Sequence, residues 1–460
     1  MKKYALVDGN SFYAACEMAF KPELKHRPVV VLSNNDGCIV AANNLAKQLD
    51  QSLQTPFSKG GYRSARKDSM MFQPYFKVAA LLKKHNTVVF SSNYELYADM
   101  SQRMHQISAQ FAKRQEIYSI DESFLDLSDM IEENIDRVTQ HAHRLKNTVQ
   151  QWIGLPVAVG IGASKTQAKL ANHLAKKNPE LQGVLDLTRL SVEQQNRLFK
   201  TVKVGSVWGI GKQIAQTLES MNILTAYDLR RCNPQTIRQL FSVNVERTLL
   251  ELNGQACLPF TGQAPTDFVN NSSYTVDKKQ IISSRSFGSL VDNFEDMRQA
   301  VASYTAIASE KLRKQNSTCK KVTVSIHTPM HRNKIQQYHN QISLELVYQS
   351  DSTILLSKMT LRALKQIWKP DFQFLKACVT LSNIEPKGAV QTDIFAPNPQ
   401  YSNNPKSDAL MRAMDAMNLK MGRGSVQLAS SGLQHTWKMN RDSMSPRCTT
   451  RWDELMSVKA

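Results

Sequence analysis

The sequence has no long apolar run and no paired cysteine motif. None of its apolar stretches approaches the roughly 18 residues that span a bilayer, and the opening MKKYALVDGN turns polar too early for a secretory signal. The seven cysteines include no CxxC pair, and their odd number does not suit a complete disulfide framework. We therefore expect a protein without a membrane span, located in the cytoplasm, whose cysteines are free thiols.

Acidic residues are scarce relative to basic ones. The chain carries 39 Asp and Glu against 58 Lys and Arg, a formal net charge of +19. Such an excess favours a polyanionic partner, because each phosphate that a cation neutralises releases condensed counterions. Charge alone fits nucleic acid and an anionic membrane surface equally. Internal repeats and low-complexity blocks are also absent from the sequence.

The first 190 residues alternate strand and helix patterns. A chain of 460 residues is too long for one core, so two to four domains are expected. Asn-Asn-Asp-Gly at residues 34–37 predicts a hairpin between two of the strands. Strands are predicted at residues 4–7, 28–32, 38–42, 87–90, 116–120, 123–127 and 156–161, and helices at 98–111 and 133–152. This order indicates an α/β layer domain.

The pattern changes from residue 204 onward. Val-Trp-Gly-Ile-Gly at 207–211, followed by a helical run to residue 221, predicts a helix-hairpin-helix, whose backbone N–H groups bind phosphate without reading bases. An ordinary pair of antiparallel helices fits the same residues. A linker is predicted at 259–273, and a helix at 408–417 follows a Pro-rich and Asn-rich stretch. Between them, strands at 280–287, 321–328, 341–347 and 376–382 and helices at 294–314 and 353–368 form a βαββαβ unit of α+β class.

Three carboxylates lie at predicted strand ends or turns. Asp8 ends a predicted strand, and Asp121 and Glu122 lie where two strand-like halves meet. Neighbouring residues on a straight strand face opposite ways, so both acids reach one cluster only at a turn. Phosphoryl transfer uses two Mg²⁺ ions about 4 Å apart, which oxygen ligands hold. Taken separately, these acids also fit ordinary solvated turns, but together in a basic chain they predict a metal site.

Longer motifs surround these acids in a fixed order. They are Asp8 with Phe12-Tyr13, VVVLSNNDGCIVAA at 29–42, FSSNYELYADMS at 90–101, YSIDESF at 118–124, GIGASKTQAKLAN at 160–172, VWGIG at 207–211 and SSRSFG at 283–288. Through them nearly the whole chain resembles the Y-family translesion DNA polymerases, and within that family the UmuC type. The resemblance implies an error-prone, DNA-directed DNA polymerase that adds deoxynucleotides to a primer 3′-hydroxyl opposite damaged template in the SOS response.

The resemblance also implies a right-handed polymerase architecture. The palm and fingers would occupy residues 1–190, with the fingers at about 21–78, and the helix-hairpin-helix thumb would occupy 191–257. The βαββαβ unit at 274–385 would be the little finger, and 386–460 a tail that binds the clamp and partners. Residues 50–69 look inserted in the fingers, either as a tolerated surface loop or as an additional contact with template or partner.

Residue roles follow from the same resemblance. Asp8, Asp121, Glu122 and the carbonyl of Gly9 would ligate two Mg²⁺ ions, and Tyr13 would be the steric gate against a ribose 2′-hydroxyl. Further nucleotide contacts are implied for Gly9, Phe12, Lys47 and Lys169, the last as the triphosphate lysine, and DNA contacts for Gly209, Gly211, Lys212 and Arg285. Lys165 lies one helical turn from Lys169. From periodicity alone these lysines fit a solvated helix face.

The tail carries a five-residue peptide, Gln-Thr-Asp-Ile-Phe. Gln391, Ile394 and Phe395 resemble the residues with which bacterial polymerases bind the sliding clamp. The implied partners are primer-template DNA, dNTP, the clamp, a processed UmuD-type dimer and a RecA filament, with no membrane. Two other functions share parts of the pattern: a catalytically silent DNA-binding accessory that occupies primer ends, and a nucleotide cyclase on the same palm topology.

Overall fold

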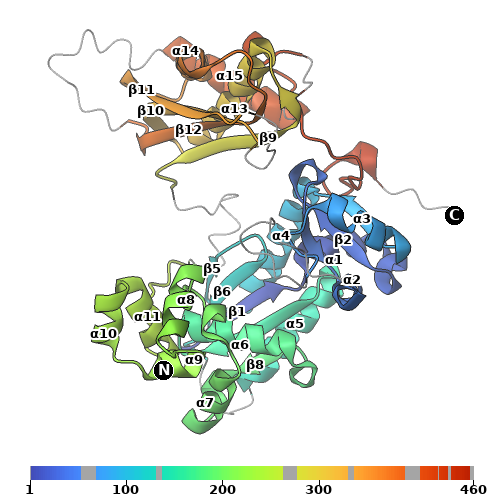
Figure 1. Cartoon of the computed structure of the whole chain (residues 1–460), viewed down its shortest axis with the longest axis vertical. Coiled ribbons are helices and arrows are strands. Elements are labelled where there is room, and N and C mark those ends of the chain that lie inside the picture. The colour runs from blue at the N-terminus through green and yellow to red at the C-terminus, as the bar shows by residue number, and fades with distance from the viewer. Residues whose placement is uncertain are drawn as a thin grey trace. The chain divides into compact units, whose positions relative to one another are not determined.

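The computed structural model describes residues 2–52, 69–130, 137–262, 277–329, 336–388, 405–422, 424–433 and 437–455. The chain forms two compact units (Figure 1). The first comprises Met1–Ser33, Gly37–Tyr274 and Ser443–Ala460, and the second Asn34–Asp36 and Thr275–Asp442. No helix in these ranges is long and apolar enough to cross a bilayer.

A five-stranded sheet forms the centre of the first unit. Its strand order is β5-β6-β1-β7-β8, in which β1 is antiparallel to both neighbours and β8 is parallel to β7. The strands are β1 (Tyr4–Gly9), β5 (Arg114–Ile117), β6 (Glu122–Asp126), β7 (Val157–Gly162) and β8 (Val184–Asp186). Helices cover both faces of the sheet, which explains why Tyr4–Val7 of β1 and the whole of β7 are apolar instead of alternating with polar residues.

The two faces of this sheet have different cores. Helices α1 (Phe12–Ala19), α4 (Tyr94–Ala109) and α5 (Arg137–Ile153) pack on the face of Ala5 and Val7, and α6 (Lys165–Lys177) packs on the face of Leu6. Helix α6 comes very close to β7. A Cβ atom added to Gly160 would lie 2.1 Å from the backbone nitrogen of Asn172, so only glycine permits this approach.

A smaller sheet lies in the region predicted as fingers. Its order is β3-β2-β4, with β2 antiparallel to β3 and parallel to β4. The predicted hairpin is confirmed, but the third strand comes from beyond residue 78. The elements of this sheet are β2 (Val29–Leu32), β3 (Ile39–Ala42), β4 (Val88–Ser91), α2 (Asn44–Gln48) and α3 (Tyr75–Lys84). Most of the segment 50–69 lies outside the described residues.

Short helices follow β8. Helix α6 buries Leu170 and Leu174 against them, so it has the sheet on one side and these helices on the other. The 3₁₀ turn Val204–Ser206, the glycines and α8 together form the predicted helix-hairpin-helix. The helices are α7 (Val192–Lys200), α8 (Lys212–Ser220), α9 (Ala226–Arg231), α10 (Pro234–Leu240) and α11 (Val243–Leu252).

The second unit has the predicted βαββαβ order. Its antiparallel sheet, β11-β10-β12-β9, is covered on one face by α13 and α14. Helix α15 is longer than the predicted 408–417 and joins this unit through Asp415, which pairs with Arg313 at 2.6 Å. The elements are β9 (Ile281–Val291), α13 (Phe294–Lys314), β10 (Ser317–His327), β11 (His339–Ser350), α14 (Thr353–Ile367), β12 (Phe374–Pro386) and α15 (Pro405–Met421).

Among the predicted boundaries that differ from the structure, two concern the candidate site and the division into units. The strand expected at 116–120 ends at Ile117, because the backbone N–H groups of Tyr118 and Ser119 both donate to the Glu122 carbonyl and close a turn. The region expected as one tail from residue 386 divides: its part up to Asp442 belongs to the second unit, and Ser443 onward belongs to the first. No local sequence pattern signals that division.

Candidate active site

Asp8 and Glu122 face each other across β1 and β6. They are direct partners in the antiparallel register, and such pairs have Cβ atoms about 4.5–5.5 Å apart on one side of the sheet. Asp121 occupies the adjoining turn, where its carbonyl accepts the N–H of Gly9 at 2.9 Å and its carboxylate accepts the Ser119 hydroxyl at 2.6 Å. The structure thus brings together the three acids that the sequence singled out.

Lysines from α6 neutralise two of these acids. Lys176 Nζ lies 2.6 Å from Asp8 Oδ1, and Lys169 Nζ lies 2.7 Å from Glu122 Oε1. Burial raises the pKa of Asp8 to about 6, and the neighbouring carboxylates add to this rise while Lys176 opposes it. Among the described residues no three His, Cys, Asp or Glu side chains already converge as a ligand set. The acids are adjacent and turned toward ammonium groups.

The donor chemistry of this cluster fits a hard divalent cation. The three side chains offer only carboxylate oxygens, the ligands that Mg²⁺ prefers. Their mutual repulsion, which contributes to the raised pKa of Asp8, is the feature that a divalent ion relieves. Gly9 allows the tight packing beside them, because a Cβ atom there would lie 2.9 Å from the Phe12 ring.

The aromatic residues after β1 lie in different environments. Phe12 is 4% exposed and belongs to the core, so its side chain is not available to a nucleotide. Tyr13 is only partly buried, and its ring stacks on Tyr97 with centroids 4.6 Å apart and planes 18° apart. The Tyr94 ring meets Tyr13 edge-on at 5.8 Å. Burial raises the pKa of Tyr13 to about 12, with a smaller contribution from nearby Asp121.

The predicted lysines have unequal surroundings. Lys165 is 4% exposed and binds both Glu116 oxygens at 2.7 Å, so it is a buried structural cation. Lys169 is enclosed by the rings of Tyr118 and Trp208, at 4.6 and 5.4 Å. Neither is on the solvated helix face that periodicity alone allows, because β5 and β6 place acids opposite this stripe of α6.

Lys176 is the site residue that sequence reasoning missed. It lies two helical turns beyond Lys169 on the same stripe, and that spacing could have revealed it. Lys47 lies nearby: its Nζ donates to Ser11 Oγ at 2.7 Å, and its pKa is lowered first by burial and then by the charge of Lys176. Lys176, which pairs with Asp8, and the neighbouring Lys47 together offer two ammonium groups as a site for a polyanionic group.

The residues predicted to contact DNA are partly in suitable places. Gly209 has a φ of 90°, and Gly211 precedes α8 with Lys212 exposed at the helix start. Arg285 pairs with the fully buried Ala377, so it lies on the helix-covered side of its sheet, where it lines a hollow with Tyr304. Gln391, Ile394 and Phe395 lie outside the described residues.

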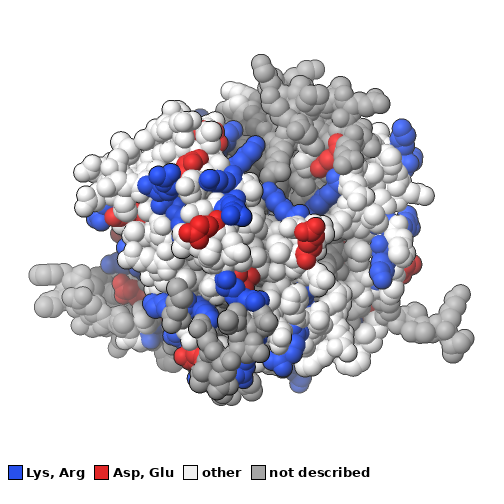
Figure 2. Space-filling model, turned by 90° about the horizontal axis from the view of Figure 1, so that it is seen from below, with Lys and Arg blue, Asp and Glu red and all other residues white. Residues whose placement is uncertain are grey.

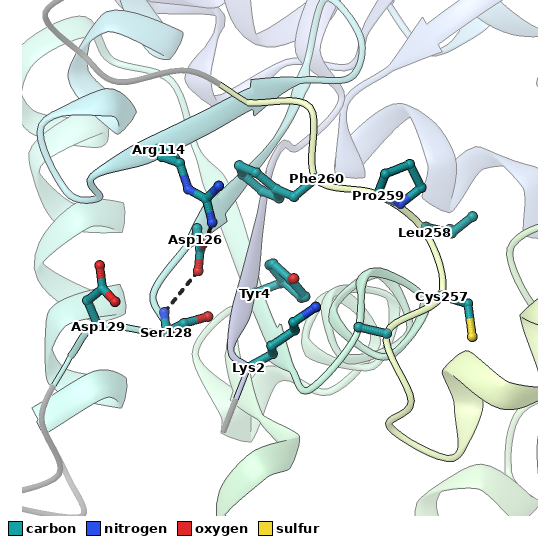
Figure 3. A pocket seen from close by; sticks show the side chains of 11 residues that line it. Lys2, Tyr4, Arg114, Asp126, Ser128, Asp129, Cys257, Leu258, Pro259 and Phe260 are labelled. Atoms are coloured by element: carbon teal, nitrogen blue, oxygen red, sulfur yellow. Dashed lines mark hydrogen bonds and ion pairs between the residues drawn. The ribbon is translucent and has the colours of Figure 1, made fainter.

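A hollow of about 440 Å³ lies at the other end of β1 (Figure 3). Tyr4 and Asp126, a cross-strand pair, are in its wall. Phe260, which follows α11, stacks on Tyr4 at 5.5 Å, with Arg114 above it at 5.3 Å. None of the three clustered acids lines this hollow. The segment 256–260, which follows α11, lines this hollow.

Basic side chains do not form a single patch on the face of the molecule that Figure 2 shows. On the face shown in Figure 2, Lys and Arg are distributed widely, with acidic side chains scattered between them. This distribution accords with the net charge of +19. A long polyanion can therefore contact many positions, each contributing through counterion release.

Comparison with known proteins covers almost the full chain. Residues 7–54 and 62–173 match the impB/mucB/samB family, and 278–394 match the C-terminal domain of that family. The break between the first two stretches falls inside the predicted insertion 50–69. Residues 408–458 match a domain of unknown function, DUF4113.

Two relatives and one solved structure agree with this assignment. Protein UmuC of Salmonella typhimurium is 38% identical over 457 residues, 99% of this chain and 100% of that protein. Protein MucB of Escherichia coli is 37% identical over 453 residues, 98% of each chain. A Y-family DNA polymerase chimera of Dbh and Dpo4 shares the fold with a TM-score of 0.60 and 17% identity, over 84% of this chain and 99% of that one. The chain therefore belongs to the impB/mucB/samB family, the UmuC type of the Y-family DNA polymerases.

Proposed function

We propose that this chain is an error-prone translesion DNA polymerase, which extends a primer 3′-hydroxyl opposite damaged template in the SOS response. The observation that carries the proposal is the in-register pair of Asp8 and Glu122, with Asp121 on the adjoining turn. Holding three carboxylates together costs free energy in repulsion. A function that needs concentrated negative charge, such as binding cations with a triphosphate, explains why the fold accepts that cost.

The acids would hold two Mg²⁺ ions, with the Gly9 carbonyl as a further oxygen ligand. When bound, the ions would lower the pKa of the attacking hydroxyl and neutralise charge on the triphosphate and on the pyrophosphate that leaves it. The chain itself supplies position and charge. Lys176 would bind triphosphate oxygens in exchange for the Asp8 carboxylate, and Lys47 in exchange for the Ser11 hydroxyl. The charge of Lys176, which lowers the pKa of Lys47, favours an anion between them. We assign Lys169 mainly to neutralising Glu122.

Tyr13 is proposed as the gate that excludes ribonucleotides. Its ring rests on Tyr97, so it cannot sink to make room for a 2′-hydroxyl. The proximity of Tyr13 to Asp121 supports a sugar site beside the acids. Discrimination would therefore come from steric exclusion against a supported ring and not from recognition of the 3′-hydroxyl.

DNA would be held through its phosphates by both units. The start of α8, with Gly211 and Lys212, offers free backbone N–H groups and positive charge. In the second unit, the sheet face opposite α13 and α14 carries small polar and basic side chains, among them Thr323, Thr380 and Lys376. Such contacts fix the position of a duplex without reading its bases, as synthesis on any template requires.

Further partners are proposed from the sequence and the relatives. Gln391, Ile394 and Phe395 would bind the sliding clamp, and a processed UmuD-type dimer and a RecA filament would act with the chain. UmuC-type relatives extending over the full length support these assignments.

Primer extension across an abasic site, with Mg²⁺ and dNTPs, tests the proposal. It is run with and without the clamp, the UmuD-type dimer and the RecA filament. Wild type should extend, and Asp121→Ala should lose activity by several orders of magnitude while still binding primer-template. Binding of primer-template without extension by either protein would favour the silent accessory, and DNA-independent conversion of a nucleoside triphosphate would favour the cyclase.

A further inference from the structure

The residues 443–455, the last part of the region that matches the domain of unknown function, pack on the first unit. We refer to them as the returning segment. Its first residues extend the small sheet: Ser91 N donates to the Ser443 carbonyl at 3.0 Å, Ser443 N donates to Ser91 Oγ at 3.0 Å, and Met444 bridges Ser91 in parallel. The edge strand β4 is thereby covered at its end.

The next residue, Ser445, reaches a buried polar network. Asn93, which is 1% exposed, donates to the Ser445 carbonyl and hydroxyl, both at 3.0 Å, while its own Oδ1 caps α4 through Leu96 N. The Ser445 hydroxyl donates to Glu17 Oε1 at 3.0 Å. Glu17 is 2% exposed, so its carboxylate cannot be hydrated by solvent, and the protein's own donors must provide its hydrogen bonds.

The second donor to Glu17 is Tyr97, whose ring stacks on the proposed gate residue Tyr13. Tyr97 donates its hydroxyl to the same Oε1 atom at 2.7 Å, and the Tyr97 ring supports Tyr13 at 4.6 Å. Burial raises the pKa of Glu17, and the bonds from Tyr97 and Ser445 oppose that rise. Glu17 is therefore a shared acceptor between the returning segment and the ring beneath the gate.

A charged clamp fixes the rest of the segment. Arg447 Nη1 lies 3.0 Å from Glu95 Oε2 in the first turn of α4, and Arg447 N and Nε donate to Glu454 at 2.6 and 2.9 Å. These bonds hold the segment against the helix that carries Tyr94 and Tyr97. Multidentate pairs of this kind fix orientation better than single exposed ion pairs do.

We infer that the returning segment is a specificity element of the polymerase site: through Ser445 and Glu17 it holds Tyr97, and thereby the height of the Tyr13 gate. Ser445 and Glu17 are positioning residues, since neither touches the reacting atoms. The inference rests on the proposed role of Tyr13. It gives the matched domain of unknown function a part in sugar selection.

Glu17 Oε1 accepts hydrogen bonds from two donors, the hydroxyls of Tyr97 and Ser445. Without the Ser445 hydroxyl, Oε1 of the buried Glu17 keeps only Tyr97, and the carboxylate can move toward water at the vacated position. Tyr97 must then follow or lose its own bond. Either response lowers support beneath Tyr13, so a ribose fits more easily while a deoxyribose fits as before.

The test measures insertion of dNTP and of the matching rNTP by the full-length chain. The variants are Ser445→Ala, which removes the hydroxyl, and Ser445→Thr, which retains it. Ser443→Ala is the matched control, because exposed Ser443 contacts β4 through its backbone. We expect Ser445→Ala to lower the ratio of kcat/KM for dNTP to that for rNTP by about threefold to tenfold, the range of one ordinary hydrogen bond, because Tyr97 still donates to Glu17. Ser445→Thr and Ser443→Ala should keep the wild-type ratio.

Each outcome is decisive when Tyr13→Ala is measured beside these variants. If Tyr13→Ala raises rNTP insertion but Ser445→Ala leaves the ratio unchanged, or lowers both efficiencies equally, the segment is only structural and the inference is overturned. If Tyr13→Ala itself leaves the ratio unchanged, the gate assignment fails and the inference with it, while polymerase activity still stands. A fall with Ser445→Ala that Ser445→Thr restores supports the positioning role.

Discussion

The raised pKa of Asp8 predicts that a catalytically dead protein is more stable than the active one. Ionising this carboxyl in the folded protein is harder than in the unfolded chain, whose carboxyl has the ordinary value of 3.8, against about 6 when folded. That difference corresponds to about 3 kcal/mol between the ionised and neutral forms. Asp8→Asn retains the shape and removes the charge, so near neutral pH and without metal it should raise the free energy of unfolding by about 3 kcal/mol.

The pH dependence has a definite sign. Because the folded pKa is the higher one, the neutral carboxyl stabilises the fold below the unfolded pKa, and this contribution is lost as pH rises through about 6. The advantage of Asp8→Asn over wild type is thus full near about pH 7.5 and falls to about half near about pH 5. Mg²⁺ should reverse the order, since it stabilises only the protein that offers it the carboxylate.

Urea denaturation followed by circular dichroism at both pH values, with and without Mg²⁺, measures these differences. Asp129→Asn serves as control, because Asp129 is exposed and its change should stay within about 0.5 kcal/mol. A metal-free Asp8→Asn protein that is less stable than wild type, or an advantage that does not shrink on acidification, would refute the electrostatic reasoning.

Three further predictions follow from the lysines and the tail. Lys176→Ala should raise KM for dNTP by about tenfold or more in steady-state kinetics and Lys169→Ala by less, because Lys176 and the neighbouring Lys47 are the proposed triphosphate ligands. The reverse order would reinstate Lys169 as the triphosphate lysine. Lys165→Ala should lower the free energy of unfolding by about 3–5 kcal/mol in urea, since it leaves Glu116 charged without its buried partner; a loss under about 1 kcal/mol would contradict that. Deleting residues 391–395 should abolish stimulation by the clamp while sparing distributive synthesis, and retained stimulation would dismiss the peptide as the clamp site.

The acids could be predicted because their signal is local. A strand end at Asp8 and a turn at Asp121 place carboxylates at a sheet edge whatever the rest of the chain does, and the register then makes Glu122 the partner of Asp8. The βαββαβ order was also predictable, because each element of the second unit has its own hydrophobic period. Longer strands than predicted arose where pairing continued through polar residues, as at Ser317 and Thr318 in β10.

The lysine roles could not be settled by such patterns. Residues 165, 169 and 176 share one stripe of α6, and the sequence treats them alike. Their ion-pair partners differ because β5, β6 and β1 present different acids along that stripe. Glu116 lies opposite the first of these lysines and Asp8 opposite the last. That match depends on strand register and on how closely α6 approaches the sheet, which Gly160 controls from another strand. The role of Ser445 is even harder to predict from sequence, since its partner Glu17 is 428 residues away.

The return of residues 443–455 to the first unit makes the second unit an insertion with two covalent tethers. A module attached at both ends keeps a high effective concentration near its neighbour and has fewer accessible orientations than one that hangs from a single linker. One proteolytic cut between residues 262 and 277 would therefore leave two fragments that still copurify, joined through the contacts of Ser445 and Arg447. Fusions or truncations near residue 455 would act on the polymerase site itself.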